Sequence, residues 1–167
     1  PTTPDRPRLT FLVGFPRSGT TMTEQILAAH PDVVTADEKP ILHATTARAF
    51  RDTGAHDAAS MLTALTPEIV TRLRDVYWTQ AARFLPSDWR DRQVVVDKAP
   101  LQMMQAPFIR AVFPDASFLW VSRDPRDTVL SCFMQDFRLS HNMANLLSIT
   151  EAARFFDAVM SFWTTMR

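Results

Sequence analysis

Near its start the chain passes from an apolar run through a glycine loop into a helical pattern. The run LTFLV predicts a short buried strand over residues 8–13, and TTMTEQILAA predicts a helix over residues 20–29. Between them, Gly14 and Gly19 stand five residues apart, although the whole sequence contains only three glycines. A strand, a glycine loop and a helix in this order bring backbone N–H groups and a helix N-terminus to one anion. The segment GFPRSGTT therefore predicts a phosphate-binding loop, rather than a strand-to-helix turn without a ligand.

The loop lacks the lysine that nucleoside-triphosphate enzymes use. That lysine follows the second glycine and reaches the β- and γ-phosphates, but here the position is Thr20, and the cation of the loop is Arg17. A P-loop kinase also needs an acidic magnesium ligand downstream, for which Asp97, at the end of a later strand, is the candidate. The missing lysine argues against ATP, and a P-loop nucleotide kinase is kept as a second hypothesis.

Apolar periodicity divides the rest of the chain into strands and helices. Two more apolar runs predict strands over residues 93–97 and 116–122. Helical spacing covers residues 40–52, 66–85, 100–114, 128–137 and 151–167, with a kink or break expected at Pro107. In the first predicted helix the apolar residues on one face are Met22, Ile26 and Ala29. Alternating strands and helices predict a three-layer α/β fold, in which a parallel sheet is flanked by helices.

One domain fits the length of 167 residues, and 46% hydrophobic residues are enough for a globular core. The Pro-rich, polar residues 1–8 are expected to form a linker, and residues 9–167 the N-terminal part of a larger domain. Three or four strands are few for an open parallel sheet, and the sequence stops inside an amphipathic helix. We therefore expect the domain to be C-terminally incomplete.

Composition excludes several classes of partner. Lys and Arg number 18 and balance the 18 Asp and Glu, so no overall field favours nucleic acid. The single cysteine, Cys132, and the four histidines lack the spacing of a metal site, and we expect none. No apolar run approaches the roughly 20 residues of a membrane span. The first residues do not resemble a signal peptide, so the cytoplasm is the expected compartment.

A second candidate anion site lies in VSRDPRDTVLS, at residues 121–131. Arg123 follows the end of a predicted strand, and Ser131 lies eight residues further on, in the next helix. Carboxyl ends of parallel strands are where α/β sheets collect ligands, and a guanidinium with a hydroxyl suits a phosphate. Alone, this segment would be read as a solvated, ion-paired turn. Together with the glycine loop it predicts a second phosphate site.

The motifs FPRSGTT, HPDVVTADEKPIL and RDPRDTVLS, in this order and context, resemble the sulfotransferase family. The likeness runs from about Leu9 to the end and is greatest to the tyrosylprotein-type and bacterial tetratricopeptide-linked members. It implies a P-loop nucleotide-binding fold and the donor 3′-phosphoadenosine 5′-phosphosulfate, with 3′,5′-ADP as product and no metal. It also implies a hydroxyl-bearing acceptor, either a protein tyrosine or a small molecule, and an upstream helical-repeat domain.

The resemblance also implies roles for residues at matching positions. The residues that would cradle the 5′-phosphosulfate are Arg17, Ser18, Gly19, Thr20 and Thr21. Those that would hold the 3′-phosphate are Arg123 and Ser131. Glu38 stands where tyrosylprotein sulfotransferases carry their catalytic glutamate, while Lys98 and Arg17 would be the cations beside the transferring group. The family's first glutamate is replaced by Asp37, and its following arginine by Pro40.

Sulfuryl transfer is consistent with these residue types, because it needs a base for the acceptor proton and cations beside the developing charge. Three hypotheses follow from the sequence: a sulfotransferase, a P-loop kinase, and a noncatalytic nucleotide-binding fragment.

Overall fold

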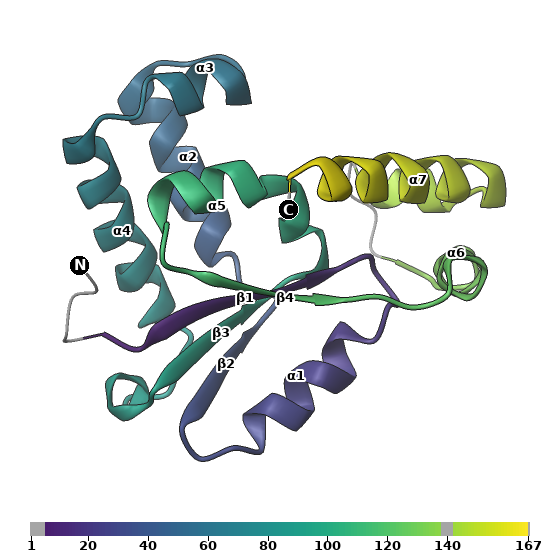
Figure 1. Cartoon of the computed structure of the whole chain (residues 1–167), viewed down its shortest axis with the longest axis horizontal. Helices are drawn as coiled ribbons and strands as arrows, with labels where there is room; N and C mark the ends of the chain where they lie inside the picture. The colour runs from purple at the N-terminus through teal and green to yellow at the C-terminus, as the bar shows by residue number, and fades with distance from the viewer. Residues whose placement is uncertain (1–5, 138–141, 167) are drawn as a thin grey trace.

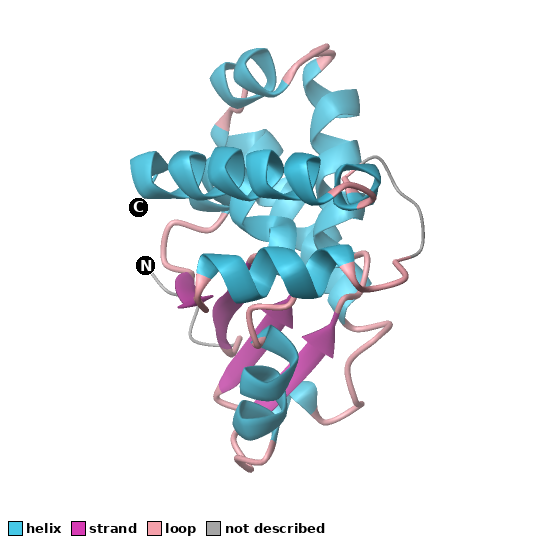
Figure 2. Ribbon diagram, turned by 90° about the vertical axis from the view of Figure 1, so that its right-hand side faces the viewer, coloured by secondary structure: helices cyan, strands magenta, loops and turns pink. Residues whose placement is uncertain are grey.

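The computed structural model describes residues 6–137 and 142–166. Its centre is a sheet of four parallel strands in the order β2-β3-β1-β4 (Figure 1). The strands are β1 (Arg8–Gly14), β2 (Val33–Asp37), β3 (Val94–Lys98) and β4 (Ser117–Val121). Helices lie on both sides of the sheet in Figures 1 and 2. The predicted three-layer α/β fold with a parallel sheet is therefore confirmed.

The two faces of the sheet carry very different amounts of helix. One face is covered by α1 (Thr20–Ala28), which contacts β1, β2 and β3. The thicker layer on the opposite face contains α2 (Ile41–Thr53), α3 (Ala58–Thr63), α4 (Pro67–Ala81), α5 (Ala106–Val112) and α7 (Ile149–Met166) (Figure 1). The helix α6 (Pro125–Phe133) follows β4 and packs against α7. Short 3₁₀ turns are η1 (Trp89–Asp91), η2 (Pro100–Gln105) and η3 (Met143–Leu146).

The hydrophobic core lies between the sheet and the thicker helical layer. Phe11 of β1 is fully buried, with its ring centroid 6.1 Å from that of Tyr77 on α4 and 6.3 Å from that of Phe113. At the edge strand β4, the ring of Phe118 lies 5.6 Å from that of Trp163 on α7. Aromatic contacts at these distances fix the thicker layer firmly on the sheet.

Sequence patterns locate most of these elements, and the caps explain why. Thr66 accepts a hydrogen bond from the N–H of Ile69, and Pro67 is the first residue of α4, as expected of an N-cap followed by proline. The helical segment 100–114 breaks into η2 and α5 just before Pro107. The helix predicted over 128–137 begins at Pro125 instead, because the side chain of Asp124 caps it, and it ends at Phe133.

Two elements were not predicted, the strand β2 and the helix α3. The five residues of β2 pair with β3 along its whole length, so the strand is defined by a partner distant in sequence. The short α3 begins after Asp57, whose side chain accepts a hydrogen bond from the N–H of Ser60. Residues 1–5 of the predicted linker and Arg167 of the predicted last helix lie outside the described residues, and Arg8 already belongs to β1.

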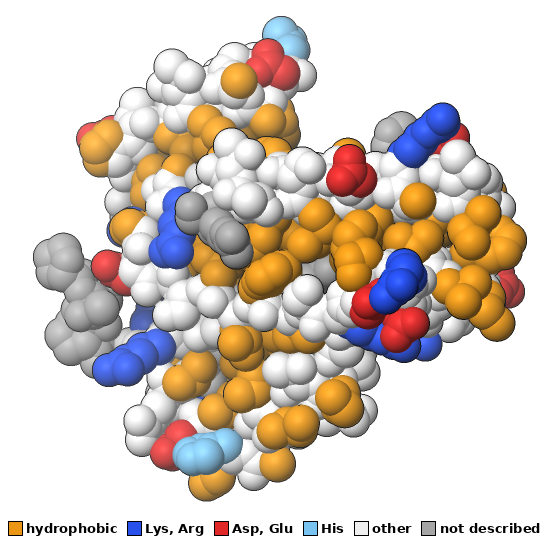
Figure 3. Space-filling view, turned by 45° about the vertical axis from the view of Figure 1, so that its right-hand side comes forward, with side chains coloured by type: hydrophobic (Ala, Val, Ile, Leu, Met, Phe, Trp, Pro, Cys, Tyr) orange, Lys and Arg blue, Asp and Glu red, His pale blue; other side chains and the backbone are white. Residues whose placement is uncertain are grey.

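The apolar face of α1 is turned away from the sheet. Met22 and Ile26 are 65% and 66% exposed, while the buried residues of this helix are Thr20 and Glu24. An amphipathic helix normally buries its apolar stripe. Here the Glu24 carboxylate is buried because it accepts a hydrogen bond from the Thr35 hydroxyl of β2. Figure 3 shows apolar side chains gathered on the surface of the molecule.

Candidate active site

The predicted site residues gather at one edge of the sheet. The four parallel strands end there, at Gly14, Asp37, Lys98 and Val121. The residues predicted for the site lie at or just after these ends, or one helix further on: Arg17, Ser18, Gly19, Thr20, Thr21, Glu38, Lys98, Arg123 and Ser131. The carboxyl ends of parallel strands are the usual ligand-binding edge of an α/β sheet.

The glycine loop has the backbone geometry of an anion site. A Cβ on Gly14 would lie 2.5 Å from the carbonyl oxygen of Val121 and 2.7 Å from Ser18 Oγ, so only glycine fits there. Gly19 has φ 106° and caps α1 without a side-chain hydrogen bond, which leaves the N–H groups of the first turn for a ligand. Ser18 Oγ is buried and has no hydrogen-bond partner within the described part of the chain. These features fit a bound phosphate.

Arg17 joins the loop to the second predicted phosphate site. Its Nε donates a hydrogen bond to Ser131 Oγ on α6, at 3.2 Å, across 114 positions of the sequence. Arg17 itself has φ 67°, a conformation that is uncommon outside glycine. Next to Ser131, the Cys132 thiol donates to the carbonyl oxygen of Pro16, at 3.2 Å. Burial raises the pKa of Cys132 to about 11, although Arg17 opposes the shift, so the thiol keeps its proton. Helix α6 is thus held against the loop at two points.

Arg123 lies apart from this contact. Its guanidinium forms an ion pair with Asp127, one helical turn further on, at 3.3 Å. Its side chain is 47% exposed, and over the residues described here no hydrogen bond links it to Arg17 or Ser131. An exposed pair of this kind is weak, so Arg123 can exchange Asp127 for an anion at little cost.

Lys98 stands at the centre of a second group of polar side chains. Its Nζ donates to Glu38 Oε1 at 3.0 Å and to Thr21 Oγ1 at 3.4 Å, and lies 2.5 Å from Asp37 Oδ1. The Glu38 N–H donates in turn to the carbonyl oxygen of Lys98, at 2.7 Å. Glu38 has φ 50°, also in the left-handed region. The structure therefore brings the predicted Glu38 and Lys98 together and joins them to the loop through Thr21.

The charge of Lys98 is maintained despite its burial. The side chain is only 1% exposed, and burial alone would lower the pKa of its ammonium. Hydrogen bonds and charges from Asp37 and Glu38 outweigh burial and raise the pKa of Lys98 above its ordinary value. Lys98 is therefore a cation at neutral pH, next to two carboxylates that are 55% and 60% exposed.

Asp97, the candidate magnesium ligand of a kinase, faces the other side of the sheet. It is fully buried, and its carboxylate accepts hydrogen bonds from the Tyr77 hydroxyl at 2.8 Å and the Gln102 amide at 3.3 Å. The hypothesis that Asp97 serves as a metal ligand beside the loop is therefore wrong. The reason is the strand itself, because successive side chains of β3 point to opposite faces.

Asp37 is the site residue that sequence reasoning did not assign. It is the last residue of β2 and the register partner of Lys98 on β3. The available signal was the run VVTAD, whose β-branched residues predict a strand. Because β2 was not predicted, its register with β3 was not predicted either, and nothing indicated that Asp37 lies beside Lys98.

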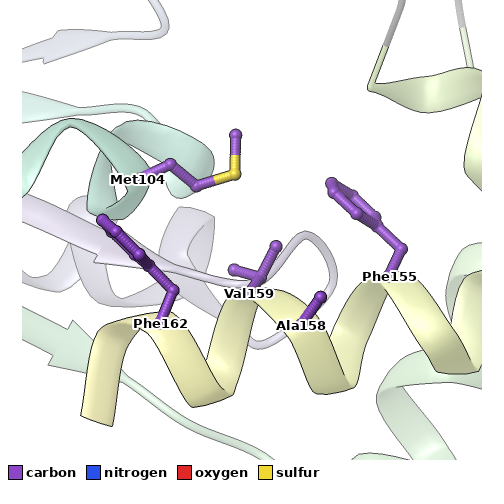
Figure 4. A pocket seen from close by; sticks show the side chains of 5 residues that line it. All are labelled: Met104, Phe155, Ala158, Val159 and Phe162. Carbon is purple, nitrogen blue, oxygen red and sulfur yellow. The ribbon is translucent and has the colours of Figure 1, made fainter. Parts of the chain in front are cut away.

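An apolar groove adjoins the loop on the side of α7. It has a volume of about 230 Å³ and is lined by Met104, Phe155, Ala158, Val159 and Phe162 (Figure 4). The ring of Phe155 also lies 5.5 Å from that of Phe15, in the loop. The loop is thus bordered by apolar side chains toward α7 and by the polar group around Lys98.

The described residues contain neither a candidate metal site nor a membrane-spanning helix. Between residues 6 and 137 and between 142 and 166, no three His, Cys, Asp or Glu residues are placed to hold a metal ion. Within the same ranges no helix is long and apolar enough to cross a membrane.

Several known proteins are similar to this chain in sequence. The chain is 26% identical to nodulation protein NoeE of Sinorhizobium fredii over 71% of its length, and 28% identical to a protein-tyrosine sulfotransferase of Drosophila melanogaster over 74%. It is also 28% identical to an uncharacterised protein of Aquifex aeolicus over 78% of its length. The chain spans 29%, 24% and 17% of these three relatives, respectively.

A family model described as the sulfotransferase family matches residues 9–167, which is almost the entire sequence. The match includes the glycine loop, the group around Lys98 and the segment from Arg123 to Ser131. This chain belongs to the sulfotransferase family.

Proposed function

We propose that the protein transfers a sulfuryl group from 3′-phosphoadenosine 5′-phosphosulfate to a hydroxyl acceptor. The observation that carries this proposal is the hydrogen bond between Arg17 and Ser131. It links the glycine loop to the second anion motif, so a donor with phosphate groups at both ends can reach both. A nucleoside triphosphate has no group for the second motif.

The donor would be held by two sets of groups. The 5′-phosphosulfate would be bound by the N–H groups of the first turn of α1, by the hydroxyls of Thr20 and Thr21, and by the Ser18 hydroxyl, which has no partner among the described residues. Arg123 and Ser131 would bind the 3′-phosphate, with Arg123 leaving its exposed partner Asp127. Arg17, between the two sets, would neutralise charge on the phosphosulfate.

The group around Lys98 would carry the chemistry. Sulfuryl transfer needs an in-line approach of the acceptor hydroxyl, a base for its proton, and a cation near the oxygen that leaves. Glu38 is 60% exposed and can meet an acceptor from solvent. Lys98 is charged and joined to Thr21 of the loop, where the phosphosulfate would lie. Glu38 is therefore proposed as the base, and Lys98 and Arg17 as the stabilising cations.

The acceptor is proposed to be a hydroxyl of a protein tyrosine or of a small molecule. Support comes from the names of relatives, which include protein-tyrosine sulfotransferases of Drosophila melanogaster, Gallus gallus and Danio rerio.

The base is tested by Glu38→Gln, which keeps the shape of the side chain and removes its charge. Transfer of labelled sulfuryl from the donor to a tyrosine peptide and to 4-nitrophenol is measured beside the affinity for 3′,5′-ADP. We expect Glu38→Gln to slow transfer by about 10²–10⁴-fold, with 3′,5′-ADP affinity nearly unchanged. The control is Glu68→Gln, an exposed glutamate in the first turn of α4.

Equal losses of transfer and of 3′,5′-ADP affinity would remove Glu38 as the base. Phosphoryl transfer from ATP with magnesium would favour the kinase hypothesis. Binding of 3′,5′-ADP without transfer to either acceptor would favour a noncatalytic nucleotide-binding protein.

A further inference from the structure

We infer that Asp37 is a positioning residue that holds Lys98 in place and leaves Glu38 free to accept a proton. The inference rests on the proposed function and assigns a role to the carboxylate that lies nearest to the Lys98 ammonium. Asp37 Oδ1 is 2.5 Å from Lys98 Nζ, whereas Glu38 Oε1 is 3.0 Å away.

Asp37 is fixed to Lys98 by the sheet. The two residues are register partners at the ends of the neighbouring parallel strands β2 and β3. Register partners on adjacent strands point to the same face, so the aspartate meets the lysine without any special backbone conformation. The contact between these two side chains thus follows from regular strand pairing.

Glu38 meets Lys98 in a different way. It lies one residue beyond the end of β2, in a left-handed conformation with φ 50°. Its backbone is held by the N–H bond to the carbonyl oxygen of Lys98, but its side chain is 60% exposed. The carboxylate can therefore leave the ammonium and turn to an acceptor while the backbone stays in place.

The two carboxylates have a joint electrostatic effect. The Lys98 ammonium has two carboxylate partners, Asp37 and Glu38. Asp37 supplies part of the negative charge that Lys98 requires, so the Glu38 carboxylate does not have to stay on the ammonium. The negative charge of Asp37 also lies near the glycine loop, because its partner Lys98 contacts Thr21 of that loop. There it repels the anionic donor. Asp37 thus supports turnover while weakening donor binding.

Asp37→Asn separates these two effects. It removes one negative charge and keeps the size of the side chain, so donor KM and the dissociation constant of 3′,5′-ADP should fall by roughly threefold to tenfold. The turnover number should fall by about tenfold or more, because Lys98 shifts toward Glu38 and occupies the base. Asp37→Glu, which restores the charge, should recover most of the turnover. Asp115→Asn, in the exposed turn before β4 at the opposite edge of the sheet, is the matched control.

A merely structural role predicts another pattern, in which donor KM rises, turnover falls, the melting temperature drops and Asp37→Glu gives no recovery. That pattern, or an unchanged turnover number in Asp37→Asn, overturns the inference. If the unmodified protein transfers no sulfuryl group, the proposed function fails instead. The affinity for 3′,5′-ADP then still decides about Asp37, because equal or weaker binding by Asp37→Asn contradicts its placement beside the anion.

Discussion

Asp97 and Lys98 are neighbours on β3, and both are almost completely buried, at 0% and 1% exposure. Their side chains point to opposite faces of the sheet. Asp97 enters the core, where Tyr77 and Gln102 donate hydrogen bonds and, among the residues that the structure describes, no cation forms an ion pair with it. Lys98 enters the site, where Asp37 and Glu38 surround its ammonium.

The partners decide which form of each group is stable. Burial raises the pKa of Asp97 to about 6, and the two donated hydrogen bonds only limit the shift. At Lys98 burial acts in the direction of the neutral form too, but two carboxylates reverse it and raise the pKa of the ammonium. A buried charge is therefore costly on the core side of β3 and maintained on the site side. The core side contributes to folding, and the site side to the proposed chemistry.

The largest expected effect is on the site side. Lys98→Met keeps an unbranched side chain but removes the charge, and we expect sulfuryl transfer to fall by about 10²–10³-fold. The control is Lys39→Met, an exposed lysine in the segment that follows Glu38. Single-turnover transfer by both variants checks the prediction. Comparable rates for the two would show that the charge of Lys98 has no part in catalysis.

The next effect is the dependence of stability on pH from the core side. Because the pKa of Asp97 is raised from 3.8 to about 6 in the folded protein, the native state binds more protons than the unfolded state between these values. The contribution of Asp97 to the free energy of unfolding therefore falls as pH rises, by about 2 kcal/mol from pH 4 to pH 7.

Asp97→Asn removes this titration. As pH rises from 4 to 7, the free energy of unfolding of Asp97→Asn should increase by that amount relative to that of the unmodified protein. Urea unfolding at several pH values measures this difference. Sulfuryl transfer should change little, and Asp115→Asn should show no such trend. A difference that stays constant with pH would contradict a raised pKa at Asp97.

The smallest effect concerns the hydroxyl that supports Asp97. Tyr77→Phe removes the donor to Asp97 Oδ2 and should lower the free energy of unfolding by about 1–2 kcal/mol. The loss should be greater at pH 7 than at pH 5, because the hydrogen bond favours the ionised carboxylate. Urea unfolding at the two pH values measures it. An equal loss at both would mean that the hydroxyl does not discriminate between the two forms of Asp97.

The same strand explains what the sequence can and cannot predict. The pattern of residues 93–97 indicates a buried strand, and the order of motifs places Lys98 and Glu38 at one edge of a parallel sheet. The face of the sheet to which the Asp97 side chain points depends on how the strands pair and where the helices pack. The sequence does not give this, so Asp97 was a candidate metal ligand. The contact of Asp37 with Lys98 was not predicted, because β2 is defined by its pairing with β3. The Arg17–Ser131 hydrogen bond likewise depends on how α6 packs against the loop.

The proposed donor is tested most directly by a titration with 3′,5′-ADP, 5′-ADP and ATP, with and without magnesium. We predict that 3′,5′-ADP binds at least about tenfold more tightly than 5′-ADP, that magnesium has no effect on it, and that Arg123→Ala abolishes the difference. Tighter binding of ATP with magnesium, or equal affinity for the two ADP isomers, would contradict a site for a nucleotide phosphorylated at both ends.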